Sequence, residues 1–177
     1  NKILLATGGT GGHIFPALAL KRELDQQIFE TIIAADSKFA KFHPFDKEHI
    51  FIPSANFSNR APIKILSSIF TLAKGFIKSL WVIYRRKPDM VLGFGGYASY
   101  PIMLAAIIFG KDIILHEANT VLGKVNKLLL PRAKYLTTGF KTIHGVKQKY
   151  FDKVIYTGNP IRPDILLDSN KKKTKSK

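Results

Sequence analysis

A glycine-rich loop near the start of the chain constrains the fold more than any other feature. The loop Gly8–His13 (GGTGGH) follows a short apolar run at 2–6 and precedes a stretch with helical spacing at 14–27. A strand, a glycine turn and a helix in this order place free backbone N–H groups at the start of a helix, where an anion can bind. The glycines also let a ligand approach the backbone without a Cβ clash. The segment therefore predicts an anion-binding turn in an α/β fold.

The loop differs from the two common nucleotide fingerprints. A G-x-G-x-x-G motif that starts at Gly9 needs a glycine at position 14, where the chain has Ile14. The Gly-Lys-Ser/Thr sequence of a P-loop is absent. Two interpretations remain open at this point, namely a ligand-binding turn and a tight strand-to-helix turn without a ligand.

The composition predicts a packed, cysteine-free protein with a strongly basic surface. Hydrophobic residues make up 46% of the 177 residues, which is enough for a core. The absence of cysteine excludes disulfides and thiolate metal sites. We expect no signal peptide, because the first apolar run is too short. The net charge of +16 favours polyanionic partners such as nucleic acid, anionic lipid or diphosphates.

Apolar runs alternate with helical stretches along the chain. The pattern predicts strands at 29–35, 49–53, 89–92, 112–117, 135–138 and 154–157, and helices at 63–86, 101–109 and 124–130. This alternation is typical of a doubly wound, Rossmann-like α/β domain with a parallel sheet and right-handed crossovers.

Two further segments follow predicted strands. A second glycine loop at 93–99 (GFGGYAS) follows the strand at 89–92, and the sequence His116-Glu117-Ala118-Asn119 ends the strand at 112–117. Ligands bind such sheets beyond the carboxyl ends of the strands, so these segments and the first glycine loop should converge on one cleft. His116 should point to the opposite face of its strand from Glu117 and have a structural role.

Four motifs in order together resemble the MurG family, the peripheral membrane transferases of bacterial peptidoglycan synthesis. They are GGTGGHIFPALA at 8–19, GFGGYASYP at 93–101, LHEANTVLGKVN at 115–126 and GNPIR at 158–162. The resemblance implies the amino-terminal domain of an inverting GT-B glycosyltransferase. Such an enzyme moves N-acetylglucosamine from UDP-N-acetylglucosamine to the muramyl sugar of lipid I, a polyprenyl-diphosphate-linked acceptor, and forms lipid II.

The resemblance covers only the amino-terminal half of the family, which carries the acceptor site and the membrane contact. We expect an acceptor-binding, membrane-associating domain at 1–163 and a basic tail or the start of an interdomain linker at 164–177. Without a second nucleotide-binding domain for UDP-N-acetylglucosamine, the chain alone should be inactive. The resemblance also implies a transfer without metal or cofactor and a place at the cytoplasmic face of the bacterial inner membrane.

The candidate catalytic residues are His13 and Glu117, either of which can serve as the base. His13 can accept a proton from the attacking hydroxyl or donate to a phosphate, unless it only bonds nearby backbone. The candidate substrate-binding residues are Gly9, Thr10, Gly11, Gly12, His13, Gly95, Gly96, Tyr97, Asn119 and Arg162. Asp36 fits a ribose ligand and a helix N-cap equally well.

The helix predicted at 63–86 has a basic and apolar surface. Between His49 and Pro88 there are seven basic residues and no acidic one. Apolar residues such as Phe70, Phe76 and Trp81 lie among them. A basic amphipathic helix of this kind can lie in the interface of an anionic bilayer, although part of its apolar stripe must pack on the sheet.

Two other classes of function fit the sequence less well. A dinucleotide-binding domain of an oxidoreductase needs the G-x-G-x-x-G motif that the chain lacks. A nucleic-acid-binding module needs basic residues interleaved with exposed aromatic residues on a sheet or a recognition helix. Because the basic residues instead gather on one apolar helix, we expect no nucleic-acid partner.

Overall fold

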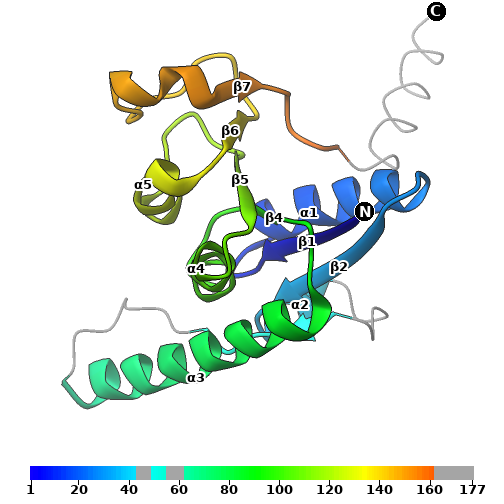
Figure 1. The fold of residues 1–177 in the computed structure, drawn as a ribbon. Helices are drawn as coiled ribbons and strands as arrows, with labels where there is room; N and C mark the ends of the chain where they lie inside the picture. The colour runs from blue at the N-terminus through cyan, green and yellow to red at the C-terminus, as the bar shows by residue number, and fades with distance from the viewer. Residues whose placement is uncertain (43–48, 55–61, 162–177) are drawn as a thin grey trace, which may run out of the picture.

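The computed structural model describes residues 1–42, 49–54 and 62–161. Seven parallel strands form one sheet in the order β3-β2-β1-β4-β5-β6-β7 (Figure 1). The strands are β1 (Lys2–Thr7), β2 (Glu30–Ala35), β3 (Ile50–Phe51), β4 (Met90–Gly93), β5 (Asp112–Glu117), β6 (Tyr135–Thr138) and β7 (Val154–Tyr156). The predicted doubly wound, Rossmann-like sheet is confirmed.

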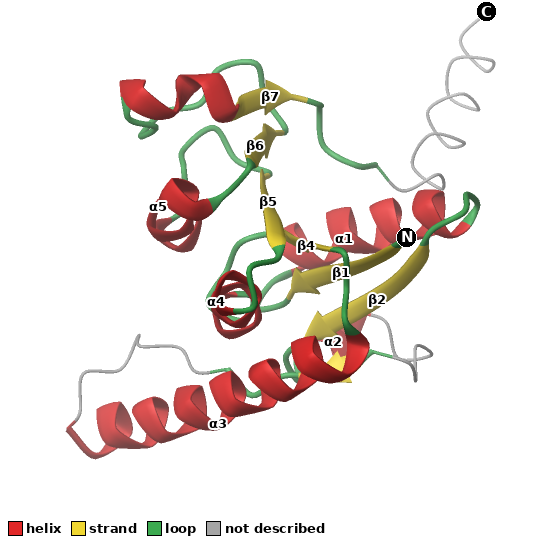
Figure 2. Cartoon of the chain, viewed as in Figure 1, coloured by secondary structure: helices red, strands yellow, loops and turns green. Residues whose placement is uncertain are grey.

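Helices cover both faces of this sheet, as Figure 2 shows in red. They are α1 (Gly11–Asp25), α2 (Phe39–Phe42), α3 (Pro62–Arg86), α4 (Tyr100–Ile108) and α5 (Lys124–Leu129), with short 3₁₀ helices at Leu130–Arg132 and Gln148–Lys153. Strand residues alternate between two cores. Leu4 and Ala6 belong to the core that includes α4 residues, whereas Leu5 packs with Ile14 and Ala17 of α1. Alternation along one strand therefore supplies apolar side chains to both layers.

The structure corrects some predicted boundaries. The first helix begins at Gly11 rather than Ile14, so Gly11, Gly12 and His13 form its first turn. Glycine has a low helix propensity, which is why the sequence pattern indicated a later start. The sequence also did not predict α2 or the 3₁₀ helices, because elements of three to six residues carry little periodicity. The strands at 112–117 and 135–138 have the predicted bounds.

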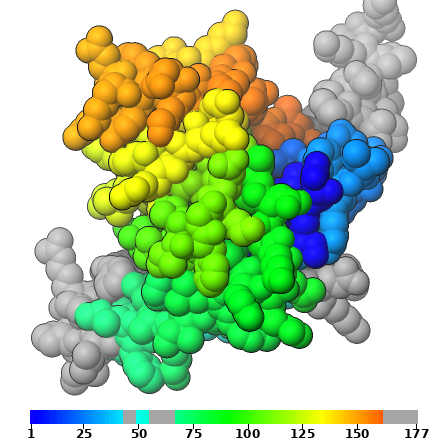
Figure 3. All heavy atoms as spheres, viewed as in Figure 1, coloured from blue at the N-terminus to red at the C-terminus, as the bar shows by residue number. Residues whose placement is uncertain are grey.

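Helix α3 has two apolar faces instead of the single predicted stripe. One face packs on the fold through Phe76, Leu80 and Ile83. Gly75 lies on this side, where an added Cβ would stand 2.0 Å from the backbone oxygen of Pro53, so only glycine permits the approach. The other face leaves Ile69, Phe70, Ile77, Trp81 and Tyr84 between 53% and 66% exposed. Figure 3 shows this helix along one side of the molecule, below α4.

The sheet topology fixes where a ligand can bind. Strand order reverses between β1 and β4, which are neighbours with Leu5 paired to Leu92. The first glycine loop follows β1 and the second follows β4. In open parallel sheets a crevice forms at such a switch point, outside the carboxyl ends of the strands. Both glycine loops therefore border the same crevice.

Candidate functional site

A pocket of about 280 Å³ lies at the carboxyl ends of β1, β4 and β5. Its lining combines residues from three segments that are far apart in the sequence. They are His13, Gly95, Gly96, Tyr97, Glu117, Asn119, Gly123, Lys124, Val125 and Asn126. The predicted convergence of both glycine loops and the segment after β5 on one cleft is therefore confirmed. Exposed Lys124 is the only cationic side chain among these described lining residues, apart from the titratable His13.

Asp36 fixes the first glycine loop. This carboxylate is 6% exposed, and its Oδ1 accepts hydrogen bonds from the N–H groups of Gly9 and Lys38, each at 3.2 Å. Its Oδ2 accepts from the Ser54 hydroxyl at 3.3 Å. An added Cβ at Gly8 would stand 2.8 Å from Asp36 Oδ1. Asp36 therefore holds the loop and the start of α2, in keeping with the capping alternative rather than with a ribose ligand.

Part of the first glycine loop retains free donors. His13 and Ile14 donate their N–H groups to the Thr10 carbonyl oxygen, both at 3.1 Å. The N–H groups of Thr10, Gly11 and Gly12 have no acceptor within the described ranges. Thr10 and Gly12 are exposed. These donors at the start of the 15-residue helix α1 suit an anion.

Ser99 fixes the second glycine loop. Its buried hydroxyl lies 3.0 Å from both the Gly95 and the Gly96 carbonyl oxygens. Gly95 and Gly96 have φ angles of 81° and 76°, a region that favours glycine. The His13 ring packs directly against them, because an added Cβ at Gly96 would lie 3.2 Å from His13 Cδ2. The two loops thus place the imidazole against bare backbone at the floor of the pocket.

Glu117 is held by four donors. Its Oε1 accepts from the Asn119 N–H at 3.1 Å and from Asn119 Nδ2 at 2.9 Å. Its Oε2 accepts from the Gly123 N–H at 2.9 Å and from Asn126 Nδ2 at 3.0 Å. The side chain is 2% exposed. In this arrangement the carboxylate organises the turn between β5 and α5 and has little capacity left for a ligand proton.

His13 differs from Glu117, because its Nδ1 atom is buried and has no hydrogen-bond partner. Buried polar atoms are almost always paired, so an orphaned ring nitrogen in a pocket indicates a missing partner. An imidazole nitrogen can accept a proton from a hydroxyl near neutral pH.

The structure brings six of the predicted site residues into the pocket, namely His13, Gly95, Gly96, Tyr97, Glu117 and Asn119. Gly9, Thr10, Gly11 and Gly12 belong to the adjoining loop but do not line it. An added Cβ at Gly11 would meet the Phe15 ring at 2.9 Å, so this glycine faces the aromatic contact of α1 with α2. Arg162 lies outside the described residues.

Sequence reasoning missed four lining residues, which are Gly123, Lys124, Val125 and Asn126. All four belong to the motif at 115–126, but the predicted helix at 124–130 gave no reason to place them in the cleft. The hydrogen bonds of Gly123 and Asn126 to Glu117 provide that reason. No group of three or more His, Cys, Asp or Glu side chains suited to a metal ion occurs in the described part of the chain.

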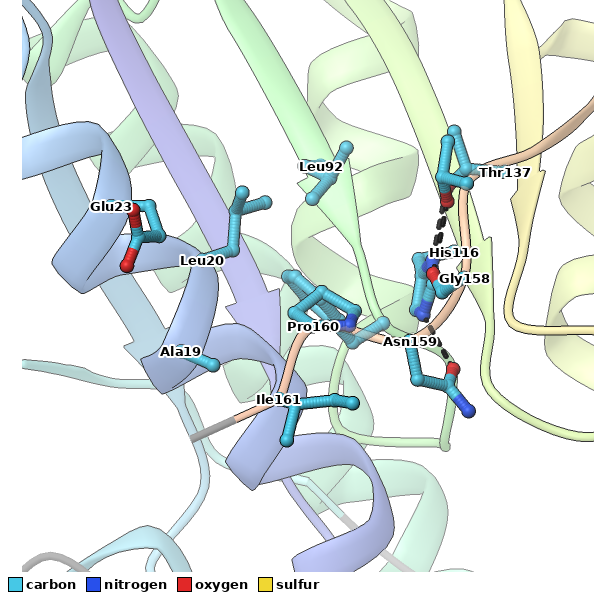
Figure 4. A pocket seen from close by; sticks show the side chains of 12 residues that line it. Ala19, Leu20, Glu23, Leu92, His116, Thr137, Gly158, Asn159, Pro160 and Ile161 are labelled. Carbon is cyan, nitrogen blue, oxygen red and sulfur yellow. Dashed lines mark hydrogen bonds between the residues drawn. The ribbon is translucent and has the colours of Figure 1, made fainter. Parts of the chain in front are cut away.

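A second, larger cavity of about 400 Å³ lies on the α1 side, between this helix and the segment 157–161 (Figure 4). His116 lines it and is 3% exposed. Its Nδ1 lies 3.0 Å from Thr137 Oγ1, and its Nε2 lies 3.2 Å from Asn159 Oδ1. Burial lowers the pKa of His116, while the Asn159 hydrogen bond and the Glu117 charge oppose that change. His116 and Glu117 line different cavities, as predicted for opposite faces of the strand, and the structural role of His116 stays a prediction.

The exposed face of α3 is basic as well as apolar. Lys74 lies 4.4 Å from the centre of the Phe70 ring, and Arg85 lies 6.0 Å from the Trp81 ring. Arg60 lies outside the described residues, and the side chains of Ile63, Lys64 and Ile65 are not described. Within the described ranges, no helix is both long and apolar enough to cross a membrane.

The comparisons agree with this geometry. Residues 3–138 match the glycosyltransferase family 28 N-terminal domain. Curated relatives include UDP-N-acetylglucosamine--N-acetylmuramyl-(pentapeptide) pyrophosphoryl-undecaprenol N-acetylglucosamine transferases. Those of Allorhizobium ampelinum and Rhizobium etli strain CIAT 652 are 40% identical over 94% of this chain and 41% identical over 93% of it. In each case the chain spans 44% of the relative's length.

Solved structures show the same fold. The crystal structure of Acinetobacter baumannii MurG matches with a TM-score of 0.70 and 26% identity, over 92% of this chain and 46% of that chain. The UDP-GlcNAc 2-epimerase from Methanocaldococcus jannaschii matches with a TM-score of 0.64 and 17% identity, over 90% of this chain and 46% of that chain, which shows the fold alone. The resemblance to MurG expected from the four motifs is confirmed, and the chain belongs to glycosyltransferase family 28, of which it carries the N-terminal domain.

Proposed function

We propose that this domain binds the lipid-linked acceptor in an N-acetylglucosamine transfer from UDP-N-acetylglucosamine to lipid I, which forms lipid II in peptidoglycan synthesis. The proposal follows the names of the curated relatives. The observation that carries it is the pocket where both glycine loops and the turn after β5 meet around the orphaned Nδ1 of His13. Neither a dinucleotide domain nor a nucleic-acid-binding module is needed to explain this arrangement.

Within this proposal His13 is the base and Glu117 is a positioning residue. The His13 ring lines the pocket and its Nδ1 atom has no partner in the described residues, so the imidazole can serve as the group that takes the proton of an attacking sugar hydroxyl. The carboxylate oxygens of Glu117 already accept four hydrogen bonds. Glu117 thereby fixes Asn119, Gly123 and Asn126 around the acceptor.

The diphosphate of the acceptor needs positive potential nearby. Exposed Lys124 lines the pocket, and the free N–H groups of Gly11 and Gly12 lie at the start of α1. Helix N-termini and lysine side chains stabilise phosphate oxygens without a metal ion. Tyr97 is 42% exposed at the pocket and supplies a hydroxyl for a sugar or a phosphate.

We further propose that α3 holds the domain at the cytoplasmic surface of an anionic membrane. Ile69, Phe70, Ile77, Trp81 and Tyr84 are exposed on this helix, and Lys74, Lys78, Arg85 and Arg86 accompany them. An apolar face with a basic border inserts into the headgroup region, and each basic residue near the surface contributes about 1 kcal/mol. Contact of this kind would bring the pocket close to a membrane-bound acceptor.

The acceptor proposal is tested by binding. The 177-residue chain should bind a soluble acceptor analogue, N-acetylmuramyl diphosphate on a short isoprenyl chain, in calorimetric titration. Gly96→Val places a branched side chain at a φ of 76° and against the His13 ring, and should abolish binding. Gly110→Val is the matched control, because Gly110 also has a positive φ but lies outside the pocket. Equal affinities of the two variants would contradict the proposal.

The membrane proposal is tested with vesicles. Flotation of the chain with vesicles should require phosphatidylglycerol and should weaken as the salt concentration increases. Both the lipid requirement and the salt effect arise from the charge of the basic residues. Trp81→Ala should reduce binding, whereas Phe151→Ala should not, although both side chains are 58% exposed. Lys74→Gln should weaken binding about fivefold, as expected for a loss of about 1 kcal/mol. Equal binding to phosphatidylcholine vesicles at every salt concentration would exclude the electrostatic part.

A further inference from the structure

The larger cavity lies on a face of the sheet that α1 covers only in part. Helix α1 packs on β1 and β2. The cavity lies beside this helix, at Leu92 of β4, His116 of β5 and Thr137 of β6 (Figure 4). Parallel strands are almost always covered on both faces, because their side chains are apolar on both sides. A cavity at this place therefore indicates that a further apolar group closes it.

The walls of this cavity are largely apolar. They include Leu20 of α1, Phe94 after β4, and Pro160 and Ile161 of the last described segment. Ile161 is 54% exposed. The volume of about 400 Å³ is well above the roughly 150 Å³ of an apolar cavity that holds a six-carbon ring. The cavity thus has room for two aliphatic side chains.

The polar groups of the lining also favour an apolar occupant. His116 Nε2 lies 3.2 Å from Asn159 Oδ1, and Asn159 Nδ2 donates to the Ala118 carbonyl oxygen at 3.2 Å. The other ring nitrogen, His116 Nδ1, lies 3.0 Å from Thr137 Oγ1. Neither of the two buried, unpartnered side-chain atoms of the described residues belongs to this lining. A polar ligand finds few free partners here, whereas an apolar group is stabilised by burial.

The chain supplies an apolar run directly after this lining. The run 165–167 (ILL) begins four residues after Ile161, and the sequence that follows it, DSNKKKTKSK, contains no apolar residue. Four residues span at most about 14 Å when fully extended, so the run cannot lie far from the cavity. A short connection of this kind gives an effective concentration in the millimolar range. The run is therefore the apolar group that reaches the cavity most readily.

We propose that residues 163–167 form a strap that folds across the larger cavity and buries apolar side chains of 165–167 in it. Neighbouring side chains point apart in strands and helices alike, so two of the three enter the cavity, in keeping with its volume. Phe94 and His116 line this cavity, while the adjoining Gly95 and Glu117 line the smaller pocket. The strap thus supports the wall between the two cavities, and it does not depend on the proposed function.

Thiol labelling tests the strap, because the chain has no cysteine of its own. Glu23→Cys places a thiol in the cavity lining, and Arg22→Cys places one outside it on the same helix, at positions that are both exposed. The strap is displaced by three substitutions made together, Ile165→Asp, Leu166→Asp and Leu167→Asp, since charged side chains avoid an apolar cavity. Displacement should speed the reaction of the Glu23→Cys chain with a neutral maleimide at least tenfold. The Arg22→Cys chain should change less than twofold.

A second tail variant controls for charge. It carries Ser169→Asp, Asn170→Asp and Thr174→Asp, which add the same charge to the tail outside the apolar run. In this background the Glu23→Cys chain should react as slowly as it does with the unchanged tail. Equal labelling rates with all three tails would overturn the strap.

Nuclear Overhauser effects in the unmodified 177-residue chain give a direct readout. Methyl groups of 165–167 should show effects to the methyl groups of Leu20 and Leu92, which line the cavity. Their absence would overturn the proposal. Effects that arise only between differently labelled copies would overturn it as well and would assign the cavity to a second copy of the chain. Acceptor titration is a separate measurement, so its failure would leave the strap in place.

Discussion

Two cavities in the described part of the domain differ in the hydrogen bonding of their buried side chains, which their volumes do not reveal. The larger one, beside α1, contains a buried histidine whose two ring nitrogens both have partners, Thr137 and Asn159. The smaller one contains His13 and Asn126, each with a buried polar atom that lacks a partner. A buried polar atom without a hydrogen-bond partner lowers the stability of the fold. Such an atom is expected where a ligand supplies the missing partner. Hydrogen-bond pairing is therefore a better guide to function here than size.

Neighbouring residues on β5 illustrate the same difference. His116 and Glu117 point to opposite sides of the strand, His116 to the larger cavity and Glu117 to the smaller one. Both are buried, and both have their polar side-chain atoms bonded. Burial and polarity alone thus do not mark a catalytic group. What distinguishes His13 is that its buried Nδ1 atom has no partner.

The largest effect is expected for His13→Ala. In a chimera of this chain with the remaining part of the Rhizobium etli relative, transfer to the acceptor should fall by about 10²–10⁴-fold, the usual contribution of a general base. Thermal stability should fall less than in Glu117→Ala, because the change removes the packing of the ring on Gly95 and Gly96 but no hydrogen bond of Nδ1. His144→Ala, on an exposed histidine, should leave the rate as it was. Transfer at the unmodified rate by the His13 variant would exclude this residue from the proton transfer.

Glu117→Ala should show the opposite pattern, a large loss of stability. Its removal leaves Asn119, Gly123 and Asn126 with donors that have lost their acceptor. The loss of these hydrogen bonds to a charged group, one of which involves the buried Asn126 amide, should lower the free energy of unfolding by about 3 kcal/mol. Chemical denaturation measures this value. A variant as stable as wild type but unable to transfer would instead make Glu117 the base.

The sequence predicted the scaffold well because glycine loops and apolar periodicity are local signals. The strand order places the residues after β1, β4 and β5 at one edge, so a reading of motifs and topology brings six site residues together. The hydrogen bonds of a side chain, in contrast, depend on residues beyond its local sequence pattern. Whether the Glu117 carboxylate is free or bonded depends on Gly123 and Asn126, which lie six and nine residues away and are positioned by α5.

Helix α3 shows a second limit of sequence reasoning. Its periodicity predicts one apolar stripe, but a helix that packs one apolar face and exposes a second one has a similar sequence pattern. The close approach of Gly75 to Pro53 turns Phe76, Leu80 and Ile83 inwards. Ile69, Phe70 and Ile77 are then left exposed. Which apolar residues remain for a membrane depends on this packing contact, and no local pattern contains it.

Asn159→Ala tests whether the larger cavity is structural. Asn159 Oδ1 is the partner of His116 Nε2, and its Nδ2 donates to the Ala118 carbonyl oxygen at 3.2 Å. Loss of the side chain leaves the buried ring nitrogen unpaired and should lower the free energy of unfolding by about 1–2 kcal/mol. Acceptor affinity should change less than twofold. A tenfold loss of acceptor affinity at wild-type stability would assign the larger cavity to the binding site.

The smallest expected effect is a dependence of stability on pH through His116. Burial lowers its pKa below the ordinary 6.5, and the Asn159 hydrogen bond and the nearby Glu117 charge keep that change limited. Because the unfolded chain takes up the proton first, the contribution to stability is complete above pH 6.5 and is lost as pH falls through the folded pKa. Asn159 Oδ1 can only accept, so Nε2 carries the proton of the neutral ring. His116→Gln cannot titrate, and its free energy of unfolding should vary less between pH 7.5 and 5 than that of wild type in denaturant titrations. The remaining histidines are common to both proteins, so they cancel in the difference.

Parallel curves for the two proteins would show that His116 titrates alike in the folded and unfolded chains, and the contrast between a paired and an unpaired histidine would then rest on His13 alone.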